Sequence, residues 1–137
     1  DLKAVLYDGS YHDVDSSGMS FEIASIQALK QGLADAGPVL LEPVVKLSVT
    51  VPDAYTGEVI SDLNVKRGRI LGMNPDNGVT LIEAEVPLAE MFGYATAIRS
   101  LSSGRASYSM EPLTFEPVPQ SIADEILDKA PKKPARA

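Results

Sequence analysis

Apolar and polar residues alternate along two stretches of the chain, which is the pattern of half-buried β-strands. In residues 44–51, one face holds Val45, Leu47, Val49 and Val51, and the other holds Lys46, Ser48 and Thr50. In residues 80–86, one face holds Thr80, Ile82, Ala84 and Val86, and the other holds Leu81, Glu83 and Glu85. Asn77-Gly78 separates the second stretch from the short apolar run Ile70–Met73. Because Asn-Gly favours a two-residue hairpin turn, we expect these last two strands to pair.

Four other segments carry apolar residues at helical spacing. The first follows Ser16 or Ser17, either of which can cap it, and ends at Gly37; its apolar residues are Met19, Ile23, Ile26, Leu29 and Leu33. The second is capped by Asp53 and stopped by Gly68, with Tyr55, Val59, Ile60 and Leu63 on its apolar face. The third begins at Pro87 and carries Leu88, Met91, Phe92, Ala95 and Ile98, with Gly93 weakening its middle. The last runs from about Gln120 to Lys129 and pairs Ile122 with Ile126.

The order of these elements in residues 43–116 predicts an α+β domain. A final strand over Arg105–Met110, with Ala106, Tyr108 and Met110 on one face, completes the order strand, helix, strand, strand, helix, strand. That order is the βαββαβ arrangement of a ferredoxin-like sandwich. Pro43 interrupts the apolar run before the first strand, so we place the domain boundary there.

Residues 1–42 and the end of the chain are simpler. Leu2–Tyr7 is predicted to be a strand, but one strand and one amphipathic helix cannot bury each other's apolar faces. We therefore interpret residues 1–42 as the end of a second domain whose other strands are missing, and the start without Met as a sign of a longer parent protein. Residues 117–129 hold the last helix, and the Pro-, Lys- and Ala-rich residues 130–137 are expected to be disordered.

Composition and charge narrow the functional classes. The 137 residues include no Cys, which excludes disulfides, thiolate metal sites and a Cys nucleophile, and favours a reducing compartment such as the cytoplasm. No stretch approaches the roughly 20 apolar residues of a membrane span, so no membrane partner is expected. The formal net charge of −7 disagrees with the broad basic face of an autonomous nucleic-acid-binding protein. Any RNA contact is therefore expected to be local.

Two motifs near the start resemble a catalytic triad and a calcium-binding loop, but their sequence context supports neither. In GSYHDVDSS, residues 9–17, Ser, His and Asp are neighbours in one loop, whereas the members of a catalytic triad converge from separate elements. Asp13, Asp15, Ser17 and Gly18 match the first positions of a calcium-binding loop, but Ala24 stands where that loop requires a bidentate Glu. We therefore expect a polar turn, with no catalytic residue and no metal site.

Other candidate sites are similarly weak. The chain has neither a GxxxxGK[ST] P-loop nor a GxGxxG motif after a strand, so we expect no nucleotide site within it. Lys66, Arg67 and Arg69 cluster around Gly68, where they either bind phosphate or complement the dipole of the preceding helix. The larger side chains Met91, Phe92, Tyr108 and Met110 fall on the buried period and are expected in the core rather than in a ligand site.

Four longer blocks of the sequence resemble a known family. They are YDGSYHDVDSS, PVLLEPVVKLSVTVP, GEVISDLNVKRGRILGM and VPLAEMFGYATAIRSLSSGRASYSMEP. Together they span nearly the whole chain up to about Pro119, and they resemble elongation factor G, a translational GTPase. The resemblance implies that residues 1–42 are the end of domain IV, with a ribosomal protein S5 domain 2-like fold, and that residues 43–116 are domain V.

The same resemblance implies a role on the ribosome. Factors of this family couple GTP hydrolysis to the movement of tRNA and mRNA, so GTP and magnesium belong to a GTPase domain outside this chain, and the chain itself is expected not to be an enzyme. His12, with its neighbours Tyr11 and Asp13, matches the domain IV loop that faces tRNA and mRNA. Lys66, Arg67 and Arg99 are expected to face ribosomal RNA and the stalk-base proteins of the large subunit. An acidic protein can use a His and a Tyr at a loop tip to hydrogen-bond and stack on RNA without a broad basic patch.

Two alternatives remain open from the sequence. Paralogues that recycle ribosomes or displace a bound antibiotic share domains IV and V, so they would also carry these blocks. A stand-alone ferredoxin-like module that senses a ligand would need only the hairpin and the helices. Such a sensor would bind a small molecule saturably, whereas the ribosomal interpretation predicts no such binding.

Overall fold

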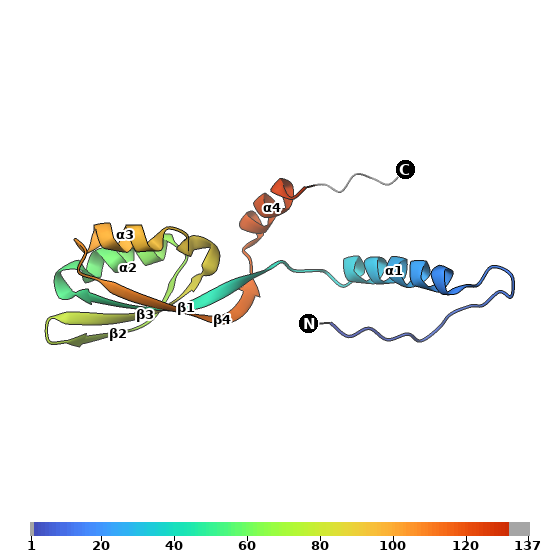
Figure 1. The fold of residues 1–137 in the computed structure, drawn as a ribbon, viewed down its shortest axis with the longest axis horizontal. Helices are drawn as coiled ribbons and strands as arrows, with labels where there is room; N and C mark the ends of the chain where they lie inside the picture. Colours follow the sequence, from blue (N-terminus) through green and yellow to red (C-terminus); the bar gives the residue numbers. More distant parts are fainter. Residues whose placement is uncertain (1, 132–137) are drawn as a thin grey trace. The chain divides into compact units, whose positions relative to one another are not determined.

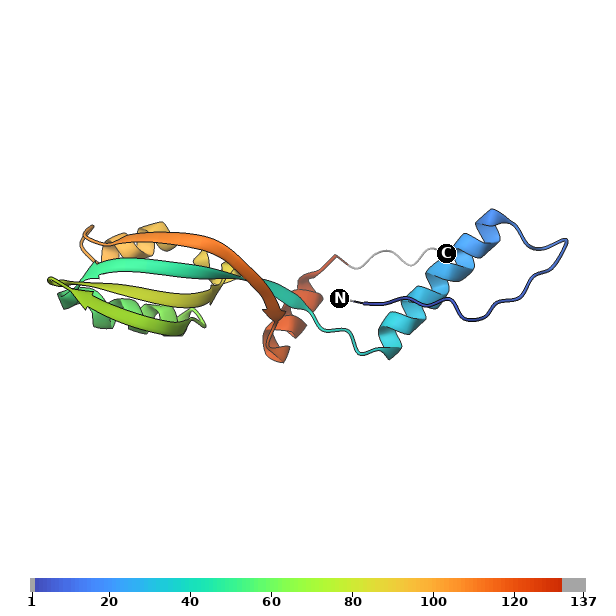
Figure 2. The same ribbon diagram turned by 90° about the horizontal axis from the view of Figure 1, so that it is seen from below.

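The computed structural model describes residues 2–131 and divides after Pro38 into two compact units. In the second unit, helices α2 and α3 lie on one face of a four-stranded sheet (Figures 1 and 2). The elements of this unit are β1 (Leu41–Pro52), α2 (Thr56–Val65), β2 (Arg69–Asp76), β3 (Val79–Pro87), α3 (Tyr94–Leu101), β4 (Ser107–Pro117) and α4 (Gln120–Lys129). Two short 3-10 turns, η1 (Asp53–Tyr55) and η2 (Leu88–Met91), precede α2 and α3.

The sheet has the strand order β2-β3-β1-β4, and each neighbouring pair is antiparallel. Together with one helix in each half, this topology confirms the predicted ferredoxin-like α+β fold. Asn77 and Gly78 connect β2 to β3 with φ angles of 49° and 87°. Two successive positive φ angles define a type I′ turn, so the predicted hairpin is also confirmed.

The core lies between the sheet and the helices α2 and α3. The predicted alternation along β1 and β3 is confirmed, because the inward-facing apolar residues of both strands are almost completely buried. Each such side chain contributes roughly 1.5–3 kcal/mol to stability. The buried cluster consists of Val45, Leu47, Val49 and Val51 of β1, Ile82, Ala84 and Val86 of β3, Val59 and Leu63 of α2, Met91 of η2, and Tyr94 and Ile98 of α3.

The second helix ends in a Schellman motif, and Arg67 rather than Gly68 takes the left-handed position. Arg67 has φ 58°, and its N–H donates to the carbonyl of Asn64, while the N–H of Gly68 donates to the carbonyl of Leu63 at 2.8 Å. A left-handed non-glycine residue costs about 1 kcal/mol. Gly68 is required for a different reason, since a Cβ there would lie 2.7 Å from the Leu63 carbonyl oxygen and 3.3 Å from Val86.

The predicted cap of this helix is wrong. The turn η1 separates Asp53 from α2, and no side chain caps either element. The Asp53 carboxylate instead accepts a hydrogen bond from the Thr80 hydroxyl at 2.7 Å, and its backbone N–H donates to the Gly78 carbonyl at 3.1 Å. Asp53 therefore ties the end of β1 to the β2–β3 hairpin.

The helix predicted from Pro87 is wrong as a single element. The chain makes η2, extends at Phe92, and begins α3 at Tyr94 after Gly93, which has φ 75°. This break changes which residues point inward, so Tyr94 is buried and Phe92 is 82% exposed. The left-handed conformation of Gly93 is the physical cause, because it interrupts the helical hydrogen-bond ladder.

The expected core assignment of four large side chains is therefore half right. Met91 belongs to the buried cluster and Tyr108 packs against it, whereas Phe92 lies on the surface. Met110 is 38% exposed because β4 is an edge strand at that point. Edge strands have a neighbour on one side only, so their side chains are covered less completely.

Strand β4 is longer than predicted and changes where the second unit begins. It continues past Met110 to Pro117, because its second half pairs with residues 41–44 of β1. The N–H of Val118 then donates to the carbonyl of Leu40 at 2.9 Å. These bonds include residues before Pro43 in the second unit, so the units divide after Pro38.

The first unit contains the helix α1 (Gly18–Asp35). Ser17 caps it as predicted, accepting from the N–H of Ser20 at 3.1 Å, and Gly37 follows its end with φ 72°. Leu2–Tyr7, predicted to be a strand, forms no strand, since no other strand lies within residues 2–38 to pair with it. The predicted apolar stripe of α1, which consists of Met19, Ile23, Ile26, Leu29 and Leu33, is exposed throughout.

The last helix spans the predicted Gln120–Lys129, and its buried residue is Ala123 rather than Ile122 or Ile126. The tail expected to be disordered, residues 130–137, falls outside the described residues beyond position 131.

Replacing Gly68 with Ala is expected to destabilise the second unit by about 2–3 kcal/mol, because the new methyl group meets backbone atoms that cannot move away. Gly57→Ala in helix α2 is the matched control. Nothing lies within 4 Å of a Cβ at Gly57, so this change is expected to stabilise by about 0.5–1 kcal/mol. Urea unfolding followed by circular dichroism measures both, and equal effects of the two variants would contradict the close approach at Gly68.

Candidate nucleic-acid interface

The loop that contains Tyr11, His12 and Asp13 is tied to the start of α1. The backbone N–H of His12 donates to the Ser16 hydroxyl at 2.7 Å, and the His12 carbonyl accepts from the N–H of Ser16 at 3.0 Å. Ser20 reaches back to the Asp15 carbonyl through its hydroxyl at 3.2 Å. Backbone bonds therefore hold the loop, and the imidazole of His12 is exposed and takes no part in them.

An exposed aromatic pair lies beside His12. The rings of Tyr11 and Phe21 stack with their centroids 6.2 Å apart and their planes 12° apart. Tyr11 is 66% exposed and Phe21 is 47% exposed. Flat aromatic surfaces of this kind are what unpaired RNA bases stack on. Among residues 2–131, no three His, Asp or Glu side chains lie close enough to hold a metal ion.

Most cations of the second unit are already paired. Within residues 39–131 the ion pairs are Lys46–Glu83, Lys66–Asp62, Arg67–Glu42, Arg67–Glu90, Arg69–Glu85, Arg69–Glu116 and Lys129–Glu125. Lys66, one of the predicted ribosome-facing residues, bonds Asp62 one turn earlier on α2 at 2.9 Å. A phosphate that approached Lys66 would have to compete with that carboxylate.

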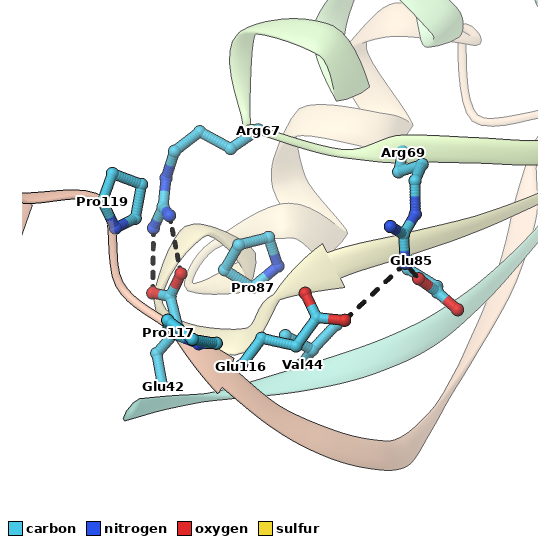
Figure 3. Close-up of a pocket in the computed structure, with 9 residues that line it drawn as sticks. All are labelled: Glu42, Val44, Arg67, Arg69, Glu85, Pro87, Glu116, Pro117 and Pro119. Atoms are coloured by element: carbon cyan, nitrogen blue, oxygen red, sulfur yellow. Dashed lines mark hydrogen bonds and ion pairs between the residues drawn. The ribbon is translucent and has the colours of Figure 1, made fainter. Parts of the chain in front are cut away.

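Arg67 is the most strongly held of these cations (Figure 3). Its two terminal nitrogens donate to the two carboxylate oxygens of Glu42 at 2.7 and 3.0 Å, and its Nε donates to Glu90 at 3.1 Å. The hydrogen bond to Glu42 is the main cause that raises the pKa of Arg67 above its ordinary value, and burial opposes it. Such two-pronged pairs are stronger than single contacts between exposed charges.

Arg99 and Arg105 differ from the other cations of this unit. Both are exposed, and neither has an ion-pair partner within residues 39–131. They flank the end of α3, where Ser103 has φ 53° and the N–H of Gly104 donates to the Arg99 carbonyl at 2.8 Å. The predicted residue Arg99 thus lies on a surface where a cation is free to meet an anion.

The turn between these two arginines is held from beneath. The buried hydroxyl of Ser102 donates to the Ile98 carbonyl at 2.7 Å and accepts from the N–H of Ala106 at 3.0 Å. On the outer side, the hydroxyls of Tyr55 and Ser103 lie 3.5 Å apart. Hydrogen bonds of Ser102 therefore hold the connection from α3 to β4. Arg105 was not selected from the sequence as a candidate site residue, because it was placed at the start of the last predicted strand.

Tyr94 anchors the start of α3 in the core. Its ring packs edge-on against Tyr108, with centroids 5.1 Å apart, and its hydroxyl has no hydrogen-bond partner among the described residues. Burial raises the pKa of Tyr94 well above its ordinary value, and the charge of Asp62 adds to the effect. Tyr94 was not among the predicted core residues, because the predicted helix placed Ala95 inward.

Comparison with known proteins assigns both units. The family described as "Elongation factor G C-terminus" matches residues 39–126, and that described as "Elongation factor G, domain IV" matches residues 1–37. The chain belongs to the elongation factor G family. A crystal structure of a protein from Thermus thermophilus is 44% identical, with a TM-score of 0.77 over 90% of this chain. This chain spans 19% of that neighbour's length.

Membership of the elongation factor G family confirms the resemblance found from the sequence blocks and argues against a stand-alone ligand-sensing module. The two matched regions, domain IV and the C-terminal domain, correspond to the two compact units, which divide after Pro38. No helix within residues 2–131 is long and apolar enough to cross a bilayer. The roles of His12, Tyr11, Asp13, Lys66, Arg67 and Arg99 stay predictions, because similarity at the level of domains does not test single residues.

Replacing Tyr94 with Phe is expected to change how stability depends on pH. The raised pKa means that folding favours the neutral phenol, so this contribution is present below pH 10 and is lost as pH rises above the unfolded value of about 10. Tyr94→Phe should therefore lie within about 1 kcal/mol of the unchanged protein at pH 7, because the hydroxyl has no partner to lose. Between pH 7 and pH 11 the stability of this variant relative to the unchanged protein should rise by about 1.4 kcal/mol.

Urea unfolding at pH 7, 9 and 11 measures this difference. Tyr7→Phe is the control, since Tyr7 is 93% exposed and its replacement should leave the pH dependence unaltered. Parallel pH profiles for the Tyr94 variant and the unchanged protein would show that the phenol is not held neutral by the fold.

Proposed function

We propose that this chain is the ribosome-docking end of an elongation factor G that promotes GTP-dependent translocation of tRNA and mRNA. The observation that carries the proposal is the end of α3, where Arg99 and Arg105 are exposed and have no ion-pair partner within residues 39–131, in a domain of the elongation factor G C-terminal family. Within residues 39–131 the other cations are neutralised by carboxylates of the same unit. An RNA contact is therefore expected to centre on these two side chains.

The contact at α3 is electrostatic in character. Exposed arginines neutralise phosphate charge and release bound counterions, so their contribution depends on salt. The hydrogen bonds of Ser102 hold the backbone from which both arginines project, so binding does not have to order this turn, and the entropy lost on binding is that of the two side chains. The proposed partners of this surface are ribosomal RNA and the stalk-base proteins of the large subunit.

The domain IV loop supplies the second contact. His12 is exposed next to the stacked pair Tyr11–Phe21, and the N-terminus of α1, with no acidic residue in its first turn, follows directly. A helix N-terminus attracts phosphate, and an exposed His can donate a hydrogen bond to RNA. We therefore propose that Tyr11, His12 and Asp13 face tRNA and mRNA. Lys66 is a weaker candidate for an RNA contact, because it already forms an ion pair with Asp62.

The chemistry of the parent factor is proposed to reside outside these residues. The neighbour from Thermus thermophilus is matched over only 19% of its length, so a GTPase domain with its GTP and magnesium would belong to the remainder of such a factor. The role of the present residues is then mechanical, in the cytoplasm. A recycling or ribosome-protection factor would use the same surfaces, and a single-round translocation assay of a full-length factor that carries these residues separates these activities.

Replacing Arg99 with Met is expected to weaken co-sedimentation of this chain with ribosomes several-fold and to reduce the slope of log K against log salt by about 1. His12→Ala is expected to weaken binding with a smaller change of slope, because hydrogen bonding and stacking release fewer counterions than an arginine placed on phosphate. Lys46→Met is the matched control, since Lys46 is a half-buried cation that already pairs with Glu83 at 3.5 Å.

Circular dichroism must show that each variant is folded. Equal losses for Arg99→Met and Lys46→Met would point to a general charge effect and contradict a contact centred on α3. If the folded, unchanged chain showed no salt-dependent binding, the docking role of these residues on their own would be disproved.

A further inference from the structure

Two acidic residues face each other where the chain enters and leaves the sheet of the second unit. Glu42 of β1 pairs directly with Glu116 of β4, and the next pair outward, Leu41 with Pro117, is the last of the ladder. Beyond it, the bond from Val118 to Leu40 joins the two strands once more. Like charges directly opposite on neighbouring strands repel, so this pair destabilises the end of the sheet unless an opposite charge compensates it.

Arg67 supplies that charge from the end of α2. Its guanidinium lies against Glu42 with both hydrogen bonds formed, and the Glu42 side chain is only 12% exposed (Figure 3). The bond to Glu90 ties the same guanidinium to η2. One side chain therefore joins α2, η2 and the first residues of β1 around a cavity of about 240 Å³.

Arg69 compensates the other acidic residue much more weakly. It reaches Glu116 at 3.6 Å, and its side chain is 65% exposed. Exposed pairs at such distances contribute little to stability. The backbone of Arg67 also distinguishes it from Arg69. Its left-handed conformation, with φ 58°, favours Gly or Asn, yet the position is occupied by an arginine whose three side-chain nitrogens all donate to carboxylates.

We propose that Arg67 is a clamp, a positioning residue rather than a ligand of RNA. It ties the first residues of β1 to α2 and η2, and its charge offsets the repulsion between Glu42 and Glu116 that works against the pairing of β1 with β4. A phosphate that approached this guanidinium would meet Glu42 and Glu90 at hydrogen-bonding distance, and both would repel it. The clamp fixes the point at which the chain passes into the sheet and out of it toward α4. The inference bears on the proposed function in one respect: it removes Arg67 from the residues expected from the sequence to face ribosomal RNA. The clamp itself does not depend on that function.

Hydrogen exchange of the full chain tests the clamp. Arg67→Met keeps the cost of the left-handed backbone and removes only the charged group, so the amides in residues 41–44 and 114–118 that bond across the β1–β4 ladder should exchange about tenfold faster or more, while Val49 and Ile82 stay protected. Glu42→Gln removes the repulsion with Glu116 together with the charged partner of Arg67, so it should accelerate exchange less than Arg67→Met. The double variant should exchange no faster than the faster single variant, because both changes remove one interaction.

Arg67→Lys and Arg69→Met complete the test. Lysine can pair with Glu42 but cannot form both hydrogen bonds, so Arg67→Lys should lie between the unchanged protein and Arg67→Met. Arg69→Met, two residues along, should change exchange at this end by less than about threefold. Unchanged exchange in Arg67→Met, or additive effects in the double variant, would overturn the clamp.

Ribosome co-sedimentation of the same variants separates this inference from the proposed function. If Arg67 is a clamp, neither Arg67→Met nor Glu42→Gln should alter the salt slope of binding. A drop of about 1 in the slope for Arg67→Met alone would make Arg67 an RNA ligand and contradict the proposal. The result for Arg99→Met tests the proposed function and not the clamp, because hydrogen exchange tests the clamp in the absence of ribosomes.

Discussion

The central strand β1 is the constraint on which the second unit depends. It is hydrogen-bonded to β3 on one side and to β4 on the other, and its inward-facing valines and leucine meet residues of both helices. Each of these helices connects two strands of this one sheet. Helix α2 leads from β1 to β2, which pairs with β3, and α3 leads from β3 to β4, which pairs with β1. The two helices therefore cover the same face, and the residues at their ends emerge next to strand ends, where charged side chains meet.

In both halves of the fold, the chain passes from helix to strand through a Gly-Arg pair, but the arginines have different surroundings. Helix α2 is followed by Arg67-Gly68-Arg69, and α3 is followed by Ser103-Gly104-Arg105. In each turn a left-handed residue precedes the glycine, and in the second turn Gly104 is left-handed as well. In the first half, carboxylates of β1, β3, β4 and η2 receive both arginines. In the second half, Ser103 replaces the first arginine, and Arg105 has no such partner within residues 39–131. Two related turns thus differ in outcome: the arginines of the first are paired with carboxylates, and the arginine of the second is an exposed cation without such a partner within residues 39–131.

The parts of this structure that could be predicted from sequence are those governed by local pattern. Alternation along β1 and β3, the Asn77-Gly78 turn and the cap at Ser17 each depend on a few neighbouring residues, and each is correct. The break before α3 could not be predicted, because helical spacing continues through Gly93 and only tertiary packing selects Tyr94 over Phe92. Leu2–Tyr7 has the composition of a strand, but a strand exists only where another segment accepts its hydrogen bonds.

Charge behaves in the same way at the candidate site. The cluster of Lys66, Arg67 and Arg69 is the most basic stretch of the chain and is the natural place to expect phosphate, but register brings Glu42, Glu85 and Glu116 to it from three positions distant in sequence. Sequence spacing says which side chains are cationic, whereas the fold decides which of them are already neutralised. An acidic chain with net charge −7 can therefore still present a cation to RNA, provided that its carboxylates are committed elsewhere. That is the position of Arg99 and Arg105, because helix α3 has no acidic residue in its first turn and its end points away from the paired cluster at β1 and β4.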